Sequence, residues 1–289
     1  MKVLICGIGA VGSIYADKIQ QYDADSLRIL VDEERLERYT KNPPVFNGRE
    51  LHLNYVLPHE TDFKADLILI TTKFDGLERA VKNIKNFIHD KTLILSLLNG
   101  VTSEDVIAEV YGRKHVVDGF FMGNSAVRTG RFVEHDEGNT LVFAPNKSLA
   151  QYFDKVGINY ETPLDIRRAM WLKFMLNAAS NQGSAVFRMN FGEMCSSADF
   201  MEFAKNIMAE VQAIAKAEGV NNTETMIEET IALMRSIRPE GRTSMLQDIE
   251  AGRKTEVDLF AGTIVKLGLK HGIPTPHNEA LTQRLAGSI

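Results

Sequence analysis

Cysteine is nearly absent from this chain. Its two cysteines, Cys6 and Cys195, belong to no CxxC pair and to no other metal-like spacing, and such sparse use predicts free thiols in a reducing compartment. The seven histidines form neither HExxH nor HxH nor a cluster with cysteine, so the sequence predicts no metal site. Disulfide-rich secreted proteins and zinc-dependent enzymes are therefore disfavoured.

The chain also lacks a strong charge imbalance and long apolar runs. Its formal net charge of -5 favours neither nucleic acid nor an anionic membrane as a partner. The apolar run from Val3 to Cys6 ends at Gly7, far short of a signal-peptide core or a membrane span. We see no internal repeat or low-complexity tract. These features predict a cytoplasmic globular protein that binds neither nucleic acid nor membrane.

The length of 289 residues predicts two domains, and the sequence pattern changes near Pro163. Before this residue, short β-rich runs alternate with helical stretches, as in buried parallel strands joined by crossover helices. Runs at 132–135 and 140–144 flank a turn-forming segment, which predicts an antiparallel hairpin that extends the sheet. The expected parallel strands span residues 3–6, 27–32, 65–72, 92–98 and 115–121.

After Pro163 the sequence shows helical periodicity and no convincing strand. Long helices are expected over 165–187, 197–218 and 243–271. Thr275 and Pro276 are typical of an N-cap followed by proline in the first turn, so they predict a short last helix. The fold class is therefore α/β, with a parallel-sheet domain at 1–163 and an all-helical domain at 164–289.

A glycine motif follows the first expected strand and precedes a helical stretch. Within it, Gly7 permits a tight turn, Gly9 lets the backbone approach a pyrophosphate, and Gly12 lets helix and strand pack closely. The helix N-terminus then offers unpaired N–H groups to the phosphates. This context predicts that the first half is a Rossmann-type dinucleotide-binding domain. The motif has the form GxGxxG and comprises Gly7, Ile8, Gly9, Ala10, Val11 and Gly12.

Asp32 closes the second expected strand, twenty residues beyond the last glycine of the motif. A carboxylate there can accept hydrogen bonds from the adenosine ribose hydroxyls of NAD, and it would repel the 2'-phosphate of NADP. Arg35 could instead reach a 2'-phosphate, while Glu33 and Glu34 add negative charge. Asp32 could also act only as a helix cap. These residues favour NAD over NADP and leave the choice open.

Polar residues form a stripe on the first long helix of the second half. Lys173, Asn177 and Asn181 are spaced by four, and most residues around them are apolar or small. Burying an unpaired ammonium costs several kcal/mol in order of magnitude, so Lys173 is expected to face a polar cleft or a ligand. The alternative is that the stripe faces bulk solvent. In the functional interpretation Lys173 protonates a carbonyl oxygen while the asparagines bind the substrate. Glu256, with Ser244 earlier on the same expected helix, is the candidate carboxylate partner.

Together these features resemble the ketopantoate reductase (2-dehydropantoate 2-reductase) family over essentially the whole chain. The resemblance implies that Lys73 lies near the cofactor and that Asn99 lies near the nicotinamide and the substrate. Taken alone, these two would be an ordinary strand-end lysine and part of a common Asn-Gly turn. The resemblance rests on Gly7–Gly12, Thr72-Lys73, Leu98-Asn99-Gly100-Val101, Lys173 with Asn177 and Asn181, Thr243–Asp248, and Thr255-Glu256.

The same resemblance assigns roles in the helical half. It implies that Lys173 is the general acid, that Asn177, Asn181 and Ser244 bind the substrate, and that Glu256 supports the lysine. We therefore predict an enzyme that transfers a hydride from NAD or NADP to a small-molecule 2-keto acid in a cleft between the domains. Ketopantoate or a close analogue is the expected substrate, and a homodimer is a candidate assembly.

Two residues depart from the family pattern. Phe191 stands before Gly192-Glu193 where members that reduce ketopantoate usually have asparagine, and Gly241 stands where another polar residue is usual. Losing a donor amide and gaining a ring would favour a more apolar substrate side chain. An NAD-dependent D-2-hydroxyacid dehydrogenase for branched or aromatic 2-keto acids is therefore the alternative enzyme. Asp32 likewise departs from the family's common NADP preference.

Two functions of other classes would share the glycine loop. A dinucleotide sensor without catalytic activity needs the loop for binding, and a Rossmann-like methyltransferase has a similar loop. Neither of them needs the polar stripe that contains Lys173. The stripe on a second helical domain therefore favours the reductase.

Overall fold

The computed structural model describes residues 1–123, 126–136 and 138–285. The chain divides into two units, Met1–Ile166 and Arg167–Ile289, and this division lies three residues beyond the predicted boundary at 163. We describe each unit by itself. Cys6 and Cys195 are both free thiols, as expected.

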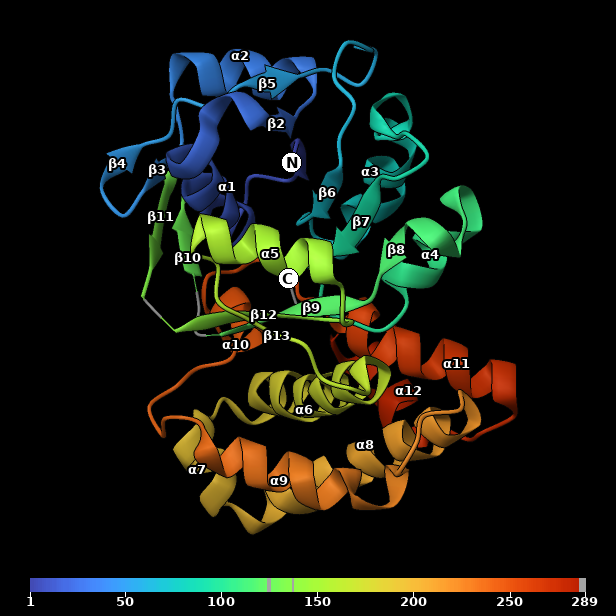
Figure 1. Ribbon diagram of the computed structural model, residues 1–289. Helices are drawn as coiled ribbons and strands as arrows, with labels where there is room; N and C mark the ends of the chain where they lie inside the picture. The colour runs from blue at the N-terminus through green and yellow to red at the C-terminus, as the bar shows by residue number, and fades with distance from the viewer. Residues whose placement is uncertain (124–125, 137, 286–289) are drawn as a thin grey trace. The chain divides into compact units, whose positions relative to one another are not determined.

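The first unit is built on a parallel sheet (Figure 1). Every pairing within this sheet is parallel, and the registers place the carboxyl ends of neighbouring strands at one edge. The predicted strands 3–6, 27–32, 65–72 and 92–98 are confirmed within about two residues at each end. Across the sheet the strands lie in the order β5 (Tyr55–Val56), β2 (Leu27–Leu30), β1 (Val3–Cys6), β6 (Leu67–Ile70), β7 (Leu93–Ser96) and β8 (Val116–Val117).

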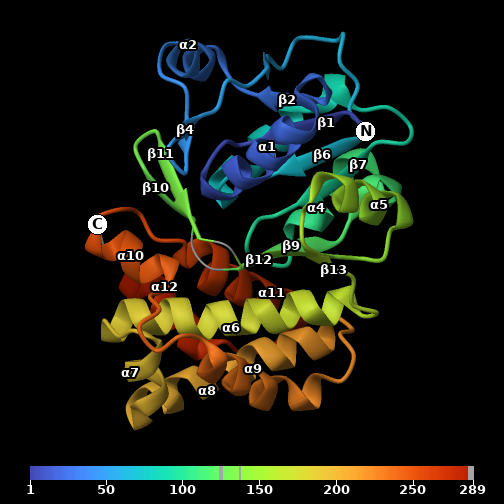
Figure 2. The same cartoon turned by 60° about the vertical axis from the view of Figure 1, so that its left-hand side comes forward.

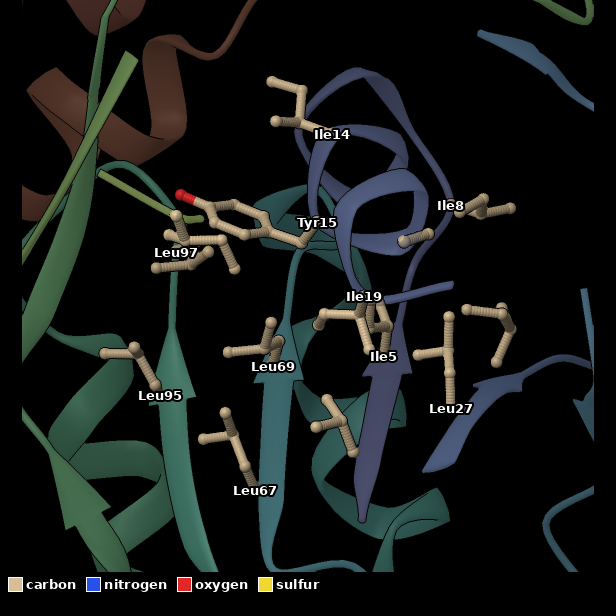
Figure 3. Packing of buried hydrophobic residues seen from close by; sticks show 14 of the residues in the cluster. Ile5, Ile8, Ile14, Tyr15, Ile19, Leu27, Leu67, Leu69, Leu95 and Leu97 are labelled. Carbon is tan, nitrogen blue, oxygen red and sulfur yellow. The ribbon is translucent and has the colours of Figure 1, made fainter. Parts of the chain in front are cut away.

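Two hydrophobic cores cover the two faces of this sheet, because alternate residues of a strand point to opposite sides. On one face Ile5 and Leu69 pack with Ile19 of the first helix, and Tyr15 of that helix lies next to Leu97 (Figure 3). On the other face Ile68 belongs to a core that also includes residues of α3 (Leu77–Asn83) and α4 (Ser103–Tyr111). The continuous apolar runs thus reflect burial on both faces. The helices of this unit are α1 (Ala10–Asp23), α2 (Glu33–Lys41), α3 (Leu77–Asn83), α4 (Ser103–Tyr111) and α5 (Lys147–Val156).

Two smaller sheets complete the first unit, and they show that the predicted hairpin of 132–135 with 140–144 is wrong. Strand β11 (Phe132–His135) pairs antiparallel with β10 (Ala126–Thr129) and parallel with β3 (Val45–Phe46), which pairs with β4 (Arg49–Glu50). Strand β12 (Asn139–Phe143) lies in the other sheet. Neither strand joins the parallel sheet, because each finds its partners elsewhere along the chain.

The third sheet also divides the strand predicted over 115–121. Strand β12 lies between β9 (Gly119–Gly123) and β13 (Tyr160–Glu161). Residues 116 and 117 remain in the parallel sheet as β8, whereas β9 leaves it. Gly119 allows this close approach, since a Cβ there would lie 2.7 Å from the Val142 carbonyl oxygen. The single apolar run therefore supplies two strands of different sheets.

The second unit is helical, and its described residues contain no strand. Helix α6 (Ile166–Phe187) confirms the helix predicted over 165–187. Along one side of it lie α7 (Phe191–Ser196), α8 (Ala198–Ala217) and α9 (Met226–Ser236) (Figure 2). Within the described chain, no helix combines the length and apolar character needed to cross a membrane. The other helices are α7 (Phe191–Ser196), α8 (Ala198–Ala217), α9 (Met226–Ser236), α10 (Ser244–Glu250), α11 (Thr263–His271) and α12 (Pro276–Leu285).

The long helix predicted over 243–271 is wrong, because the chain turns after α10. Gly252 has a φ of +64°, and the N–H of Arg253 donates to the Asp248 carbonyl at 2.7 Å. A left-handed glycine at this place is a common end of a helix. Helical structure resumes at Val257 and passes through a π-helical turn, η6 (Asp258–Gly262), into α11.

Candidate active site

The glycine motif connects β1 to α1 in the first unit. Gly7 has a φ of +106°, and a Cβ there would lie 2.9 Å from backbone atoms of Thr71 and Thr72. A Cβ on Gly12 would overlap the Gly7 carbonyl oxygen and lie 2.7 Å from Thr71 Oγ1. Gly7 therefore requires glycine for the turn, and Gly12 requires it for close packing of strand and helix.

The start of α1 is open to a ligand. A Cβ built on Gly9 meets no described atom within 4 Å, and the side chains of the described residues provide no cap for this helix. Ala10 and Val11 begin the helix, while Ile8 is buried beneath the loop. The first N–H groups of a helix and its dipole attract anions. The residues present thus fit the pyrophosphate of a dinucleotide.

Thr71, which follows β6, holds the glycine loop by hydrogen bonds, a role that the sequence did not predict. Its hydroxyl donates to the carbonyls of Cys6 and Gly7, at 3.2 and 2.5 Å. The hydroxyl of Thr72 is buried and has no hydrogen-bond partner among the described residues. A threonine after a buried strand is common, so no sequence signal marked Thr71.

Asp32 acts as the N-cap of α2. Its Oδ1 accepts the N–H of Arg35 at 2.8 Å, and the guanidinium of Arg35 donates to its Oδ2. Both side chains remain partly exposed, 43% for Asp32 and 41% for Arg35. The helix-cap role that the sequence left open is therefore present. The same pair places a carboxylate and a guanidinium together just after β2.

Lys73 and Asn99 follow two neighbouring strands of the parallel sheet. Lys73 lies three residues beyond the end of β6, directly before the short helix η2 (Phe74–Gly76), and its side chain is exposed. Asn99 lies three residues beyond the end of β7 and is half-buried. Since β6 and β7 pair in parallel register, both residues lie at the carboxyl edge of the sheet. Ligands bind at this edge in sheets of this kind.

The polar stripe lies on α6 of the second unit. Lys173 and Asn177 are half-buried, whereas Asn181 is 6% exposed. Phe174 and Met175 are fully buried on other faces of the helix, and the ring of Phe174 packs near that of Phe260. The stripe therefore lies among residues that are mostly apolar or small, which the sequence pattern predicted.

Asn181 and Ser244 are brought together by the fold. Asn181 Oδ1 accepts the Ser244 hydroxyl at 3.0 Å and the N–H of Met245 at 3.3 Å. Thr243 caps the same helix start and shares a hydrogen bond with the Ser184 hydroxyl. The Asn181 oxygen therefore fastens α10 to α6. Its amide N–H groups make no hydrogen bond within the described residues.

Glu256 does not share a helix with Ser244, contrary to the prediction. It lies six residues beyond the end of α10 and directly before the helical residues that start at Val257. Its carbonyl accepts the N–H of Leu259 at 3.0 Å, and its side chain is half-buried. The turn at Gly252 removes the helical spacing on which the prediction rested.

The two residues that depart from the family pattern, Phe191 and Gly241, contact each other. Phe191 begins α7 and is 9% exposed, and its N–H donates to the Gly241 carbonyl at 3.0 Å. A Cβ on Gly241 would lie 3.3 Å from Phe191 Cδ2 and 2.9 Å from the Arg238 carbonyl oxygen. The Arg238 carbonyl oxygen, and to a smaller extent the Phe191 ring, thus limit position 241 to a small residue. The two departures form one packing unit.

Comparison with known proteins identifies the family. Residues 3–148 match the family described as "Ketopantoate reductase PanE/ApbA", and residues 165–288 match its C-terminal part. The chain belongs to the ketopantoate reductase family. A 2-dehydropantoate 2-reductase of Aquifex aeolicus is 27% identical over 300 residues, which cover 98% of this chain and 95% of that protein. Members of this family are oxidoreductases, and the chain is one of them.

Solved structures show the same fold. A D-mandelate dehydrogenase bound to NADH and anilino(oxo)acetate matches with a TM-score of 0.86 and 24% identity, covering 100% of this chain and 98% of its own. A dimeric ketopantoate reductase from Staphylococcus aureus matches with a TM-score of 0.78 and 21% identity over 100% and 98% of the two chains. At these identities the match concerns the fold alone. The family supports a nicotinamide dinucleotide as the cofactor.

Proposed function

We propose that this protein reduces a 2-keto acid of the 2-dehydropantoate type to the 2-hydroxy acid. The observation that carries the proposal is the stripe of Lys173, Asn177 and Asn181 among mostly apolar or small residues of α6, with Asn181 bonded to Ser244. A dinucleotide sensor has no use for such a stripe. The family and its named reductases support the same activity.

The residues divide the chemistry between the two units. In the proposal Gly7–Gly12 hold the pyrophosphate, and Lys73 and Asn99 contact the cofactor near its reactive end. The bound dinucleotide supplies the hydride. Lys173 gives a proton to the keto oxygen, which carries the developing negative charge. The remaining groups orient the substrate or the lysine, namely Asn99, Asn177, Asn181, Ser244 and Glu256.

A panel of 2-keto acids tests this function. Purified protein is mixed with NADH or NADPH, and oxidation of the cofactor is followed with ketopantoate, ketoisovalerate and phenylpyruvate. We expect turnover with at least one of the first two acids and formation of the corresponding 2-hydroxy acid. Dinucleotide binding without turnover of any 2-keto acid would instead favour the sensor.

We propose that NADH is the better cofactor, because the Asp32 carboxylate should repel a 2'-phosphate at short range. The Asp32→Ala variant should narrow the ratio of kcat/KM for NADH over NADPH by about tenfold, since it removes this charge and frees the Arg35 guanidinium. Arg35→Ala should widen the same ratio. A higher kcat/KM with NADPH in the unmodified enzyme would show that the argument from Asp32 is wrong.

The pair formed by Phe191 and Gly241 should shape substrate preference. We expect ketoisovalerate to rival ketopantoate, and Phe191→Asn should shift the kcat/KM ratio toward ketopantoate by roughly 1 to 3 kcal/mol if it restores a hydroxyl contact. Phe191→Leu is the control, because it changes the packing without adding an amide. Thermal unfolding of both variants measures the cost of the lost ring. A strong preference for ketopantoate in the unmodified enzyme would contradict this role of Phe191 and Gly241.

We also propose a cellular setting and an assembly for this protein. We infer a cytoplasmic enzyme, because its two cysteines are free and its relatives are named reductases. We also propose a homodimer, as in the Staphylococcus aureus relative. Sedimentation of the purified protein at several concentrations distinguishes a dimer from a monomer.

A further inference from the structure

The hairpin of β10 and β11 carries an arginine on the face that packs against α1 (Figures 1 and 2). Alternate residues of a strand point to opposite sides, and directly paired residues of two antiparallel strands share a side. Arg128 pairs with Val133, which is 1% exposed and belongs to the core that includes residues of α1. Val127 is 45% exposed. The strand therefore turns its valine toward solvent and its cation inward.

The inward guanidinium of Arg128 contacts the glycine motif. Its Nη1 donates to the Ile8 carbonyl at 2.6 Å, and its Nε donates to the Gly130 carbonyl at 2.9 Å. Ile8 directly precedes Gly9, where an added Cβ would meet no described atom within 4 Å. A guanidinium is a planar group with five N–H donors, and these two bonds use two of them. The other donors therefore lie within one guanidinium width of the open part of the loop.

The charge of Arg128 is not balanced by a carboxylate. Within the described residues its printed bonds go to neutral carbonyls alone, and its side chain is half-buried. Arg131 of the same hairpin differs, because its guanidinium donates to the Glu50 carboxylate at 2.9 Å. A partly buried charge without a counter-charge is costly, so an anion beside it is stabilising. The glycine motif contains no cation, and a helix N-terminus supplies only about half a positive charge.

We propose that Arg128 binds the pyrophosphate of the dinucleotide. This inference rests on the proposed function, because it adds a residue to the same cofactor site. Nη1 keeps its bond to the Ile8 carbonyl, and a remaining N–H donates to a phosphate oxygen beside Gly9. Hydrogen bonds from arginine to phosphate are charge-assisted and among the strong ones. Arg128 thus supplies the positive charge that the glycine motif lacks, and its bond to Ile8 sets its place at the loop.

Quenching of NADH fluorescence by the full chain, at low and at high salt, tests this contact. Arg128→Gln should raise the Kd for NADH by about tenfold or more. It should also flatten the dependence of Kd on salt, because one screened contact between charges is removed. ADP-ribose, which keeps the pyrophosphate and lacks the nicotinamide, should lose the same factor in competition with NADH. Arg131→Gln is the matched control and should keep both the Kd and its salt dependence, since Arg131 is already paired with Glu50.

The conservative variant separates the phosphate contact from a purely structural role. Arg128→Lys keeps the charge and loses the planar fork, so it should recover part of the affinity and of the salt dependence. It also carries the test if thermal unfolding shows that Arg128→Gln is destabilised. Weaker binding with an unchanged salt dependence would mean that Arg128 only holds the loop, which contradicts the phosphate contact.

The outcome also distinguishes this inference from the proposed function. An unchanged Kd for NADH in Arg128→Gln would overturn the role of Arg128 and leave the reductase standing. A wild-type protein that binds neither NADH nor NADPH would instead contradict the reductase itself.

Discussion

Replacing Lys173 with alanine should lower kcat by about 100-fold or more and leave dinucleotide affinity almost unchanged. A proton donor acts in the transition state, so its loss appears in the rate. The glycine loop belongs to the first unit, whereas Lys173 lies on α6 of the second. Steady-state kinetics measures kcat, and quenching of NADH fluorescence measures cofactor affinity.

Two further variants separate charge from proton donation. Lys173→Arg keeps a positive charge but donates a proton poorly, because arginine stays protonated in proteins. We therefore expect Lys173→Arg to recover part of KM and little of kcat. Lys205→Ala removes an exposed lysine of α8 and should leave both parameters unchanged. Near-normal turnover in Lys173→Ala would contradict the role of Lys173 as proton donor. A loss of cofactor binding in parallel with the rate would contradict it as well.

The pH dependence provides an independent readout of the same group. An ammonium donates a proton only while it is charged, so the rate of keto acid reduction should fall as pH rises through the pKa of Lys173 in the complex. This decline should be absent from the residual activity of Lys173→Ala. A rate that rises over the same range would indicate a general base instead.

The sequence predicted the parallel sheet well because its strands are buried on both faces. The run predicted over 65–72 is apolar at every position of β6, and β6 and β7 occupy the centres of their predicted runs. Pairing between distant segments has no comparable local signal. Strand β11 pairs with β3, about ninety residues earlier in the chain, so the local pattern wrongly suggested a hairpin with β12. A single left-handed glycine, Gly252, likewise divided a continuous helical pattern.

In the candidate site, features set by local spacing were predicted, whereas side-chain pairings and contacts between strands were not. Local spacing was enough to place the glycine loop at a helix start and Asn181 on the face of α6 that bonds Ser244. The pairing of Asp32 with Arg35 could not be derived, because a strand-end aspartate suits a ribose and a helix cap equally. Thr71 carried no signal because its role depends on two strands lying side by side.

Glu104 is a buried carboxyl group outside the proposed reaction. It lies in the first turn of α4, is 5% exposed, and its Oε2 has no hydrogen-bond partner among the described residues. Burial, aided by the Asp118 carboxylate and opposed by the backbone N–H of Glu104, raises its pKa to about 8. A helix N-terminus stabilises a negative charge by only about 1 kcal/mol, which is less than the cost of burial.

Replacing Glu104 with glutamine should therefore stabilise the protein at pH 8 far more than at pH 5. The folded-state pKa of about 8 lies above the ordinary value of 4.5, so the folded protein keeps a proton that the unfolded chain releases between these pH values. The wild-type free energy of unfolding falls across this window, and Glu104→Gln removes that loss. We expect the variant to gain about 3 to 5 kcal/mol relative to wild type between pH 5 and pH 8.

Urea unfolding at several pH values measures this gain as the difference in free energy of unfolding between the variant and the wild type. Taking the difference cancels the contributions of the other titrating groups. Glu109→Gln is the matched control, because Glu109 is an exposed glutamate of the same helix. Its difference from wild type should stay constant with pH. A constant difference for Glu104→Gln as well would show that Glu104 is ionised in the folded protein, with a partner or water that satisfies its buried oxygen.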